Sequence, residues 1–391
     1  MKTKFAAALA AMTLLFGLAS CGGGGGGIEG TGSALGTMRL SMTDAPACGF
    51  DAVHITVDRV RVHQSAGAVD ADAGWSEVVL NPAKRVDLLT LSNGVLEPLG
   101  QTELPAGKYT QMRLVLAPNT AADPLANSVT PTGGTETALT TPSAQQSGLK
   151  LNVNIDIPVG KVADFAIDFD ACKSVVKRGD SGQYNLQPVI SVTPIVSDAG
   201  LRVVGYVDPA IAVGSTVVSV QQAGVPVKAT APDATGKFVL YPVPVGSYDL
   251  VVSAVGRVTA TMTGVPVITT APTTINSAAL PIAPGATTLR SVTGSVTPAT
   301  ATVRALQAYT GGPTVEVAWA PVDATTGAFG FSLPIGAPVK LAWVANPVSL
   351  TFAPDAAVAS KYSVEATSNG VAKTQAIDAS AVVPPLVFNF P

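Results

Sequence analysis

Charged and aromatic residues are both scarce in this chain of 391 residues. Asp, Glu, Lys and Arg together make up 13% of the residues, and Phe, Trp and Tyr make up 5%. The formal net charge of the whole chain is −3, and it becomes −5 without Lys2 and Lys4. Because affinity for phosphate groups needs a concentrated basic face, this balance argues against nucleic acid as a partner.

Histidine and cysteine are rarer still, with two and three residues respectively. His54 and His63 both lie in "HITVDRVRVH", which has the alternation of a strand. Residues two apart share a face of a strand, so a spacing of nine predicts that the two imidazoles lie on opposite faces and cannot bind one metal together. The chain also lacks a nucleotide-binding glycine loop, a Cys/His cluster and a nucleophile elbow.

The N-terminus, in contrast, carries a specific pattern. Lys2 and Lys4 precede an apolar stretch over 5–18 that is too short for a membrane span. The following "LASC" ends at Cys21 and resembles the lipobox of bacterial lipoproteins. This resemblance implies a cleaved signal peptide over 1–20 and a membrane anchor of acyl chains on Cys21. Because Gly22 rather than Asp follows the cysteine, the resemblance implies the outer membrane of a Gram-negative envelope, on its periplasmic or surface face.

The rest of the chain has the composition of an all-β protein. Residues 21–36 contain an unbroken glycine run and form a Gly-rich linker that cannot bury apolar surface. Beyond it Val and Thr favour pleated sheets, Gly and Pro mark turns, and no long helical periodicity occurs. The sequence predicts several β-sandwich domains, with boundaries at 37–197, 198–283 and 284–391.

The first of these segments resembles a known family. "SMTDAPAC", "ITVDRVRVHQS", "AGWSEV", "RVDLLTLSNG", "LPAGKYTQMRLVL", "TPSAQQSGLKL" and "SGQYNLQPVI" are similar to the DUF4382 domain of bacterial envelope lipoproteins. The resemblance covers nearly all of residues 37–197, but the family has no established activity. Within this segment the polar insertion over 119–147 is expected to form a hairpin that turns at Gly133 and Gly134.

The remaining chain contains an internal repeat. "RVVGYVDP" over 202–209 is echoed by "RSVTGSVTP" over 290–298, and "PDATGKFVL" from 232 is echoed by "VDATTGAFGF" from 322. The pattern resembles carboxypeptidase-regulatory-like (transthyretin-like) β-sandwich modules. The second copy is the more divergent, because "APVKL" replaces the expected tyrosine strand. In both copies the glycine after threonine is expected to adopt a positive φ at a turn.

Cys48 and Cys172 remain once Cys21 is assigned to the lipid. In an oxidising envelope they predict one disulfide, worth about 4–5 kcal/mol on a chain-entropy estimate. A free reactive thiol and one half of a metal site are the alternatives, although a thiol pair with so few histidines is a poor zinc site.

Acidic residues cluster around "ADFAIDFDACKSVV" over 163–176. Read as a strand, the segment directs Phe165, Ile167 and Phe169 into the core and Asp164, Asp168, Asp170 and Cys172 to the other face. A disulfide would bring Asp44 nearby. Asp44, Asp168 and Asp170 could form a Ca²⁺ site, a catalytic carboxylate pair, or a polar network that caps backbone N–H groups. No other cofactor is implied.

Two further features have a structural and a functional interpretation. Trp75 either packs at the rim of the core or offers a stacking platform to a ligand. "RGDSGQ" over 178–183 resembles a serine-protease motif and contains Arg-Gly-Asp, but it is expected to be a turn between two strands. The preferred hypothesis is a non-enzymatic, lipid-anchored binding or scaffolding protein whose partner is a glycan or an envelope protein. A carbohydrate-binding lipoprotein and an Asp-dependent hydrolase are the alternatives.

Overall fold

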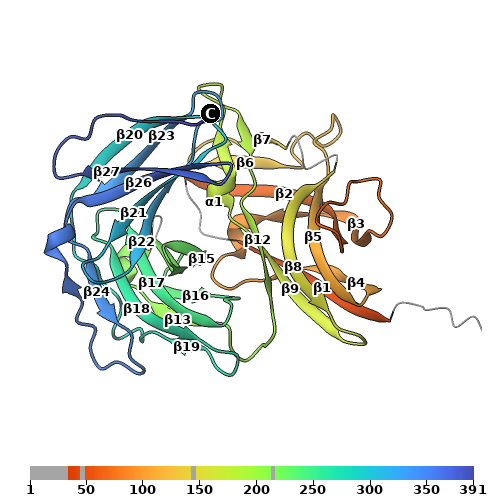
Figure 1. Ribbon diagram of the computed structural model, residues 1–391, viewed down its shortest axis with the longest axis horizontal. Coiled ribbons are helices and arrows are strands. Elements are labelled where there is room, and N and C mark those ends of the chain that lie inside the picture. Colours follow the sequence, from red (N-terminus) through yellow and green to blue (C-terminus); the bar gives the residue numbers. More distant parts are fainter. Residues whose placement is uncertain (1–33, 45–48, 142–146, 213–215) are drawn as a thin grey trace, which may run out of the picture. The chain divides into compact units, whose positions relative to one another are not determined.

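A computed structural model describes residues 34–44, 49–141, 147–212 and 216–391. Residues 34–391 form one compact unit (Figure 1). Strands dominate it, and the helices of the described ranges are short: η1 (Leu88–Leu91), α1 (Ala171–Ser174), α2 (Pro209–Ala212) and η2 (Ala356–Val358). None of the helices in these ranges is long and apolar enough to cross a membrane. The predicted all-β class is confirmed.

The first sandwich spans 35–194 and has two sheets around one core. One sheet has the order β12-β9-β1-β4 and consists of β1 (Leu35–Asp44), β4 (Glu97–Pro105), β9 (Val162–Phe169) and β12 (Ile190–Pro194). The other has the order β10-β11-β7-β6-β2-β5-β8, with β3 paired to β2. It consists of β2 (Phe50–His63), β3 (Ser76–Asp87), β5 (Gly107–Leu116), β6 (Ser128–Pro131), β7 (Thr137–Thr140), β8 (Leu149–Ile157), β10 (Val175–Lys177) and β11 (Tyr184–Leu186). Both sheets contribute side chains to one apolar cluster.

A β-bulge in β2 changes which residues face that core. Val53, Ile55 and Val57 are buried before the bulge, and Val60 and Val62 are buried after it. The register shift between Val57 and Arg59 therefore moves the outward positions from even to odd numbers. His54 and His63 consequently lie on the same, outer face, and the prediction of opposite faces was wrong. They still stand nine residues apart along the strand.

The segment over 163–176 is only partly a strand. Phe165, Ile167 and Phe169 are buried in the first core as predicted. The strand ends at Phe169, however, and α1 begins at Ala171. Asp170 and Cys172 therefore do not continue the outward face of Asp168, which corrects the expectation of one acidic strand face. The hairpin predicted at Gly133 is confirmed, because β6 and β7 pair antiparallel around it.

The second sandwich packs a three-stranded sheet against a six-stranded one. The smaller sheet, of order β16-β13-β19, consists of β13 (Val203–Tyr206), β16 (Lys237–Leu240) and β19 (Thr273–Thr274). The larger, of order β15-β14-β17-β18-β24-β25, consists of β14 (Thr216–Gln222), β15 (Val225–Thr230), β17 (Gly246–Ala254), β18 (Ala260–Val267), β24 (Val339–Ala342) and β25 (Ala353–Pro354). Its core is a separate apolar cluster.

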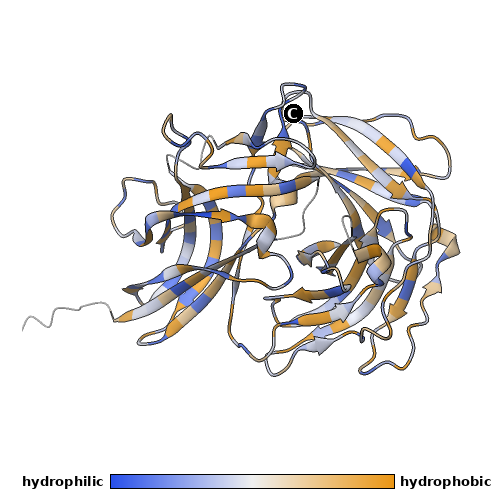
Figure 2. Cartoon of the chain, turned by 180° about the vertical axis from the view of Figure 1, so that it is seen from behind, coloured by the Kyte–Doolittle hydropathy of each residue, from blue (hydrophilic) through white to orange (hydrophobic). Residues whose placement is uncertain are grey.

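The third sandwich has a three-stranded and a four-stranded sheet around a further cluster. The first, of order β23-β20-β28, consists of β20 (Leu289–Thr297), β23 (Ala328–Pro334) and β28 (Leu386–Asn389). The second, of order β22-β21-β26-β27, consists of β21 (Thr302–Ala308), β22 (Thr314–Ala320), β26 (Lys361–Ser368) and β27 (Val371–Asp378). Hydrophobic and polar residues alternate along many of these strands (Figure 2).

The two repeat copies share a turn whose geometry requires glycine. Gly236 and Gly327 have φ values of +84° and +69°, as predicted for the residue after threonine. A Cβ atom at either would approach a backbone oxygen, Val207 O at 2.0 Å or Val296 O at 2.2 Å. In each copy an aspartate, Asp233 or Asp323, accepts hydrogen bonds from the turn. Both sandwiches thus enter β16 or β23 through a turn that combines an aspartate acceptor with a glycine of positive φ.

Candidate functional site

Asp168 and Lys228 form a buried ion pair between the first and second sandwiches. Lys228 Nζ lies 2.7 Å from Asp168 Oδ1 and also donates to Thr43 Oγ1 at 3.3 Å and to the backbone oxygen of Asp44 at 3.5 Å. The lysine side chain is only 2% exposed. Because an unpaired ammonium group is costly to bury, these acceptors allow Lys228 to lie there. The role of Asp168 is therefore to hold a lysine of the second sandwich.

Asp44 and Asp170 both cap the short helix α1. Asp44 Oδ1 accepts the N–H of Ala171 at 2.9 Å, and Asp170 Oδ1 accepts the N–H of Lys173 at 3.0 Å. Burial raises the pKa of Asp170 to about 6, although attraction to Lys173 acts in the opposite direction. In the described part of the chain, no three His, Cys, Asp or Glu residues are grouped so that they could hold a metal ion. These contacts support the polar-network interpretation of the three aspartates.

Glu316 of β22 is the point at which the three sandwiches meet. Its carboxylate lies 3.0 Å from Lys173 Nζ of the first sandwich and 3.5 Å from Arg304 Nη1 of its own. The side-chain amide of Gln221, in the second sandwich, donates to Glu316 O and accepts from Glu316 N, both at 2.8 Å. Gln221 therefore occupies backbone groups of the edge strand β22, as a neighbouring strand would. The sequence patterns gave no signal for these contacts.

A cavity of about 860 Å³ lies beside this junction. All three sandwiches line it, including Phe50 and Tyr184 of the first, β14 and β17 of the second, and β22 and β23 of the third. The side chain of Trp319 forms part of the wall, with Lys173 Nζ 4.7 Å from its ring centroid. Among the predicted site residues, Asp170 and Cys172 line this cavity. Sequence analysis missed the cavity because its lining residues are far apart along the chain.

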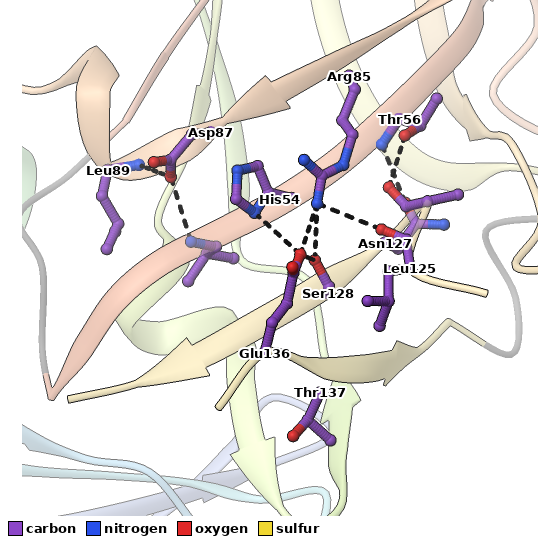
Figure 3. Close-up of polar contacts among 12 residues, drawn as sticks. His54, Thr56, Arg85, Asp87, Leu89, Leu125, Asn127, Ser128, Glu136 and Thr137 are labelled. Carbon is purple, nitrogen blue, oxygen red and sulfur yellow. Dashed lines mark hydrogen bonds and ion pairs between the residues drawn. The ribbon is translucent and has the colours of Figure 1, made fainter. Parts of the chain in front are cut away.

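A second polar cluster lies on the outer side of the eight-stranded sheet (Figure 3). Glu136 Oε1 accepts from Ser128 Oγ at 2.6 Å and from Arg85 Nη2 at 2.6 Å. His54 Nδ1 lies 3.7 Å from the same oxygen. The hydrogen bond from Ser128 lowers the pKa of Glu136 more than any other contact. The cluster keeps a carboxylate ionised next to the β6–β7 hairpin.

This cluster does not have the arrangement of an activated nucleophile. Ser128 is fully buried, and its hydroxyl donates to Glu136 instead of to a histidine. Burial, followed by repulsion from Arg85, lowers the pKa of His54 below its ordinary value of 6.5. Asp87 is occupied by the N–H groups of Val53 and Leu89 (Figure 3). The contacts of Glu136 with Arg85 and His54 connect the β6–β7 hairpin to β3 and β2, which is a structural role.

Trp75 contacts two arginines. The guanidinium carbons of Arg61 and Arg113 lie 4.5 Å and 4.7 Å from its ring centroid, and its Nε1 donates to Val69 O at 3.0 Å. Cation–π contacts of this kind favour a ring held against the sheet. The packing interpretation of Trp75 is the one that these contacts support.

The "RGDSGQ" segment is the turn between β10 and β11, as predicted. Arg178 N donates to Gln183 O at 3.0 Å, and Ser181 Oγ donates to Arg178 O at 2.6 Å. The N–H of Gly179 donates to Asp323 Oδ2 of the third sandwich at 2.7 Å. The turn is therefore fixed against a neighbouring module.

Cys172 lies in α1, whereas Cys21 and Cys48 lie outside the described residues. The signal peptide over 1–20 and most of the linker over 21–36 also lie outside them, although β1 already begins at Leu35. Lipidation of Cys21 and a disulfide between Cys48 and Cys172 therefore stay predictions.

Comparison with known proteins identifies the first sandwich. Residues 35–188 match the family model described as "Domain of unknown function (DUF4382)", so this part of the chain is a DUF4382 domain. No curated protein matches the chain at a significant level. The resemblance of the two later sandwiches to carboxypeptidase-regulatory-like modules stays a prediction.

Solved structures give distant matches. Two are chains from type II cohesin–X-dockerin complexes of Acetivibrio cellulolyticus, an N-terminal and a C-terminal interface mutant. They are 20% and 24% identical with TM-scores of 0.20 and 0.19, and each match covers 22% of this chain but only 59% and 58% of the other. A streptococcal ancillary pilin is 12% identical with a TM-score of 0.17, covering 90% of this chain and 98% of its own. With TM-scores this low, no conclusion about function follows from these matches.

Proposed function

We propose that this chain is a non-catalytic, lipid-anchored protein of the cell envelope that binds a ligand in the cavity between its three sandwiches. The observation that carries the proposal is the cavity itself. Its volume of about 860 Å³ falls in the usual range of about 300–1,000 Å³ for small-molecule sites. Such sites combine apolar walls with a few polar groups, and this cavity has both.

The state of the acidic residues favours binding over catalysis. Asp168 is paired with Lys228, Asp170 caps α1, and Glu316 is held by Lys173 and Arg304. A hydrolase that used Asp168 and Asp170 would need both carboxylates free to reach a substrate. Their partners instead give them a part in joining the modules around the cavity.

A carbohydrate ligand is the second candidate, and Trp319 is the observation that favours it. An indole ring in a cavity wall offers a flat apolar surface with a polar edge, which suits stacking on a sugar ring. The two later sandwiches, read as carboxypeptidase-regulatory-like modules, would then contribute the binding surface as well as the spacing from the membrane.

A ligand screen tests the binding proposal. The full chain is heated with EDTA, Ca²⁺, glycans and apolar organic acids, because a ligand of the native state raises the melting temperature by mass action. A true cavity ligand should lose its effect in Ser332→Trp, whose exposed side chain in β23 lines the cavity. Thr374→Trp, at an exposed position of β27, is the matched control. A ligand that stabilises both variants equally would place binding elsewhere and contradict the proposal.

The anchor is tested separately by cell fractionation. Cys21→Ala removes the residue that would carry the lipid. We expect this variant to leave the membrane fraction, since the described residues contain no membrane-spanning helix to replace the acyl chains. Retention of Cys21→Ala in the membrane would contradict the lipid anchor and leave the ligand screen unaffected.

A further inference from the structure

We propose that the ligand of the cavity is an amphipathic organic anion, with a hydrocarbon body and one acidic head group. This inference rests on the proposed binding function and names its ligand class. The charged residues that line the cavity and the apolar character of much of the remaining lining support it.

The acidic residues of the lining are already occupied by the protein. Glu316 is held by Lys173 and Arg304. Asp170 caps α1 through the N–H of Lys173. Asp323 accepts the N–H groups of Thr325, Thr326 and Gly179, and although burial acts to raise its pKa, these hydrogen bonds together lower it. None of the three acids is left to attract a cation.

Two of the three cations in the lining have no acidic partner among the described residues. Lys173 is paired with Glu316. Lys177 of β10 is exposed, and its ammonium group makes no hydrogen bond or ion pair with any described residue. The guanidinium of Arg257, in the turn between β17 and β18, donates within the described ranges only to Pro284 O, at 3.4 Å. Two cations from different sandwiches, neither paired with a described acidic residue, therefore line the cavity, and they complement an anion.

Much of the remaining lining is apolar. It includes the exposed side chain of Val255, the half-buried Val317 and Trp319, and the small residues Ala328 and Gly330 of β23. Contact between this apolar surface and a hydrocarbon body would remove both from water, which is favourable. A purely hydrophilic anion such as phosphate would leave this wall uncovered, so the combination selects an anion with an apolar body.

Three ligands with the same chain test the inference on the full protein: decanoate, its neutral amide decanamide, and decyltrimethylammonium, each below its micelle concentration. Isothermal titration should show decanoate binding at least about tenfold more tightly than the other two. In Lys177→Gln combined with Arg257→Gln, decanoate should lose about that factor while decanamide is unchanged. Lys161→Gln, which removes one exposed cation outside the cavity, should change neither.

The outcomes separate this inference from the proposed function. Equal binding of all three decyl ligands, abolished in Ser332→Trp, would overturn the charge argument and leave the cavity as a binding site. A glycan that binds in the cavity while no decyl ligand does would also overturn the inference of an amphipathic anion and leave the cavity as a binding site. Failure of every ligand would overturn both. If the double variant proved unstable, salt provides a second measurement. Added NaCl should weaken the binding of decanoate and leave the binding of decanamide unaffected. An equal effect of salt on both affinities would refute the inference.

Discussion

Single charged residues make several of the contacts between the sandwiches. Lys228, Lys173 and Glu316 all lie at boundaries between modules, and their partners come from different parts of the chain. Breaking such a pair on one side leaves a charge in a poorly solvated place, and this penalty exceeds the net value of the pair itself. The same surroundings change the acidity of neighbouring groups, and burial raises the pKa of Asp170 to about 6.

The pH dependence of stability should report on Asp170. Folding raises the pKa of its carboxyl from 3.8 to about 6, so the folded state holds the proton more tightly than the unfolded chain. Its contribution to the free energy of unfolding is therefore greatest below pH 4 and is lost as the pH rises to about 6. Asp170→Asn keeps an acceptor for the N–H of Lys173 but cannot ionise.

We expect the stability of Asp170→Asn relative to the unaltered protein to increase by about 2.5 kcal/mol between pH 4 and pH 7. Urea unfolding at several pH values measures this difference. Asp156→Asn, at an exposed position of β8, serves as the control and should show a much smaller change. If the stability difference between Asp170→Asn and the unaltered protein stays constant with pH, the pKa of the Asp170 carboxyl is not raised by folding.

At the scale of elements, β24 is the least expected strand. It comes from the second repeat copy but pairs in parallel with β18 of the second sandwich, from Ala260 opposite Val339 to Thr263 opposite Ala342. This explains why "APVKL" departs from the repeat pattern: the segment covers an edge of another module instead of building its own. Covering β18 also removes an exposed edge on which other chains could pair.

Proline at Val339 should separate this added strand. The N–H of Val339 donates to Thr259 O at 2.9 Å, and proline has no N–H. We expect Val339→Pro to lower the free energy of unfolding by about 3 kcal/mol and to expose the segment after β24 to protease. Val339→Ala keeps the N–H, so it should stay protected from cleavage. Equal cleavage of both variants would mean that the β18–β24 hydrogen bonds do not hold the segment.

At the scale of the whole molecule, residues 34–391 behave as one compact unit with three apolar cores. Strand β24 joins the sheet of the second sandwich, and at least two buried ion pairs connect different modules. Reciprocal hydrogen bonds between Gln221 and Glu316 connect the second and third sandwiches. We infer that the cavity depends on this joining, because its walls come from all three modules.

Lys228 tests how strongly the first two modules are coupled. Lys228→Met leaves Asp168 without its ammonium partner, and Asp168→Asn leaves Lys228 buried with weaker acceptors. Each change should cost about 3 kcal/mol, and the double variant should cost clearly less than the sum. Lys84→Met, which breaks the more exposed pair with Glu97, should cost under about 1 kcal/mol. Additive costs at Lys228 and Asp168 would show that the pair is not coupled.

Local signals predicted much of this fold. The glycines at Gly236 and Gly327, the hairpin at Gly133 and the buried alternation of Phe165, Ile167 and Phe169 each depend on residues close together in the chain. Sequence reasoning failed where one residue changes a register or ends a strand. The bulge between Val57 and Arg59 and the start of α1 after Asp170 both escaped it, because alternation alone cannot show an inserted or capping residue.

The amino-acid sequence by itself determined that the described chain is all-β, where its turns lie and which residues its repeats have in common. These properties follow from backbone preferences and from the two-residue period of side chains along a strand. Only the tertiary structure decided that Asp168 serves Lys228, that β24 joins the second sandwich and that a cavity lies among three modules. Such contacts join residues tens to hundreds of positions apart, and which distant groups meet is decided by how the finished modules pack together.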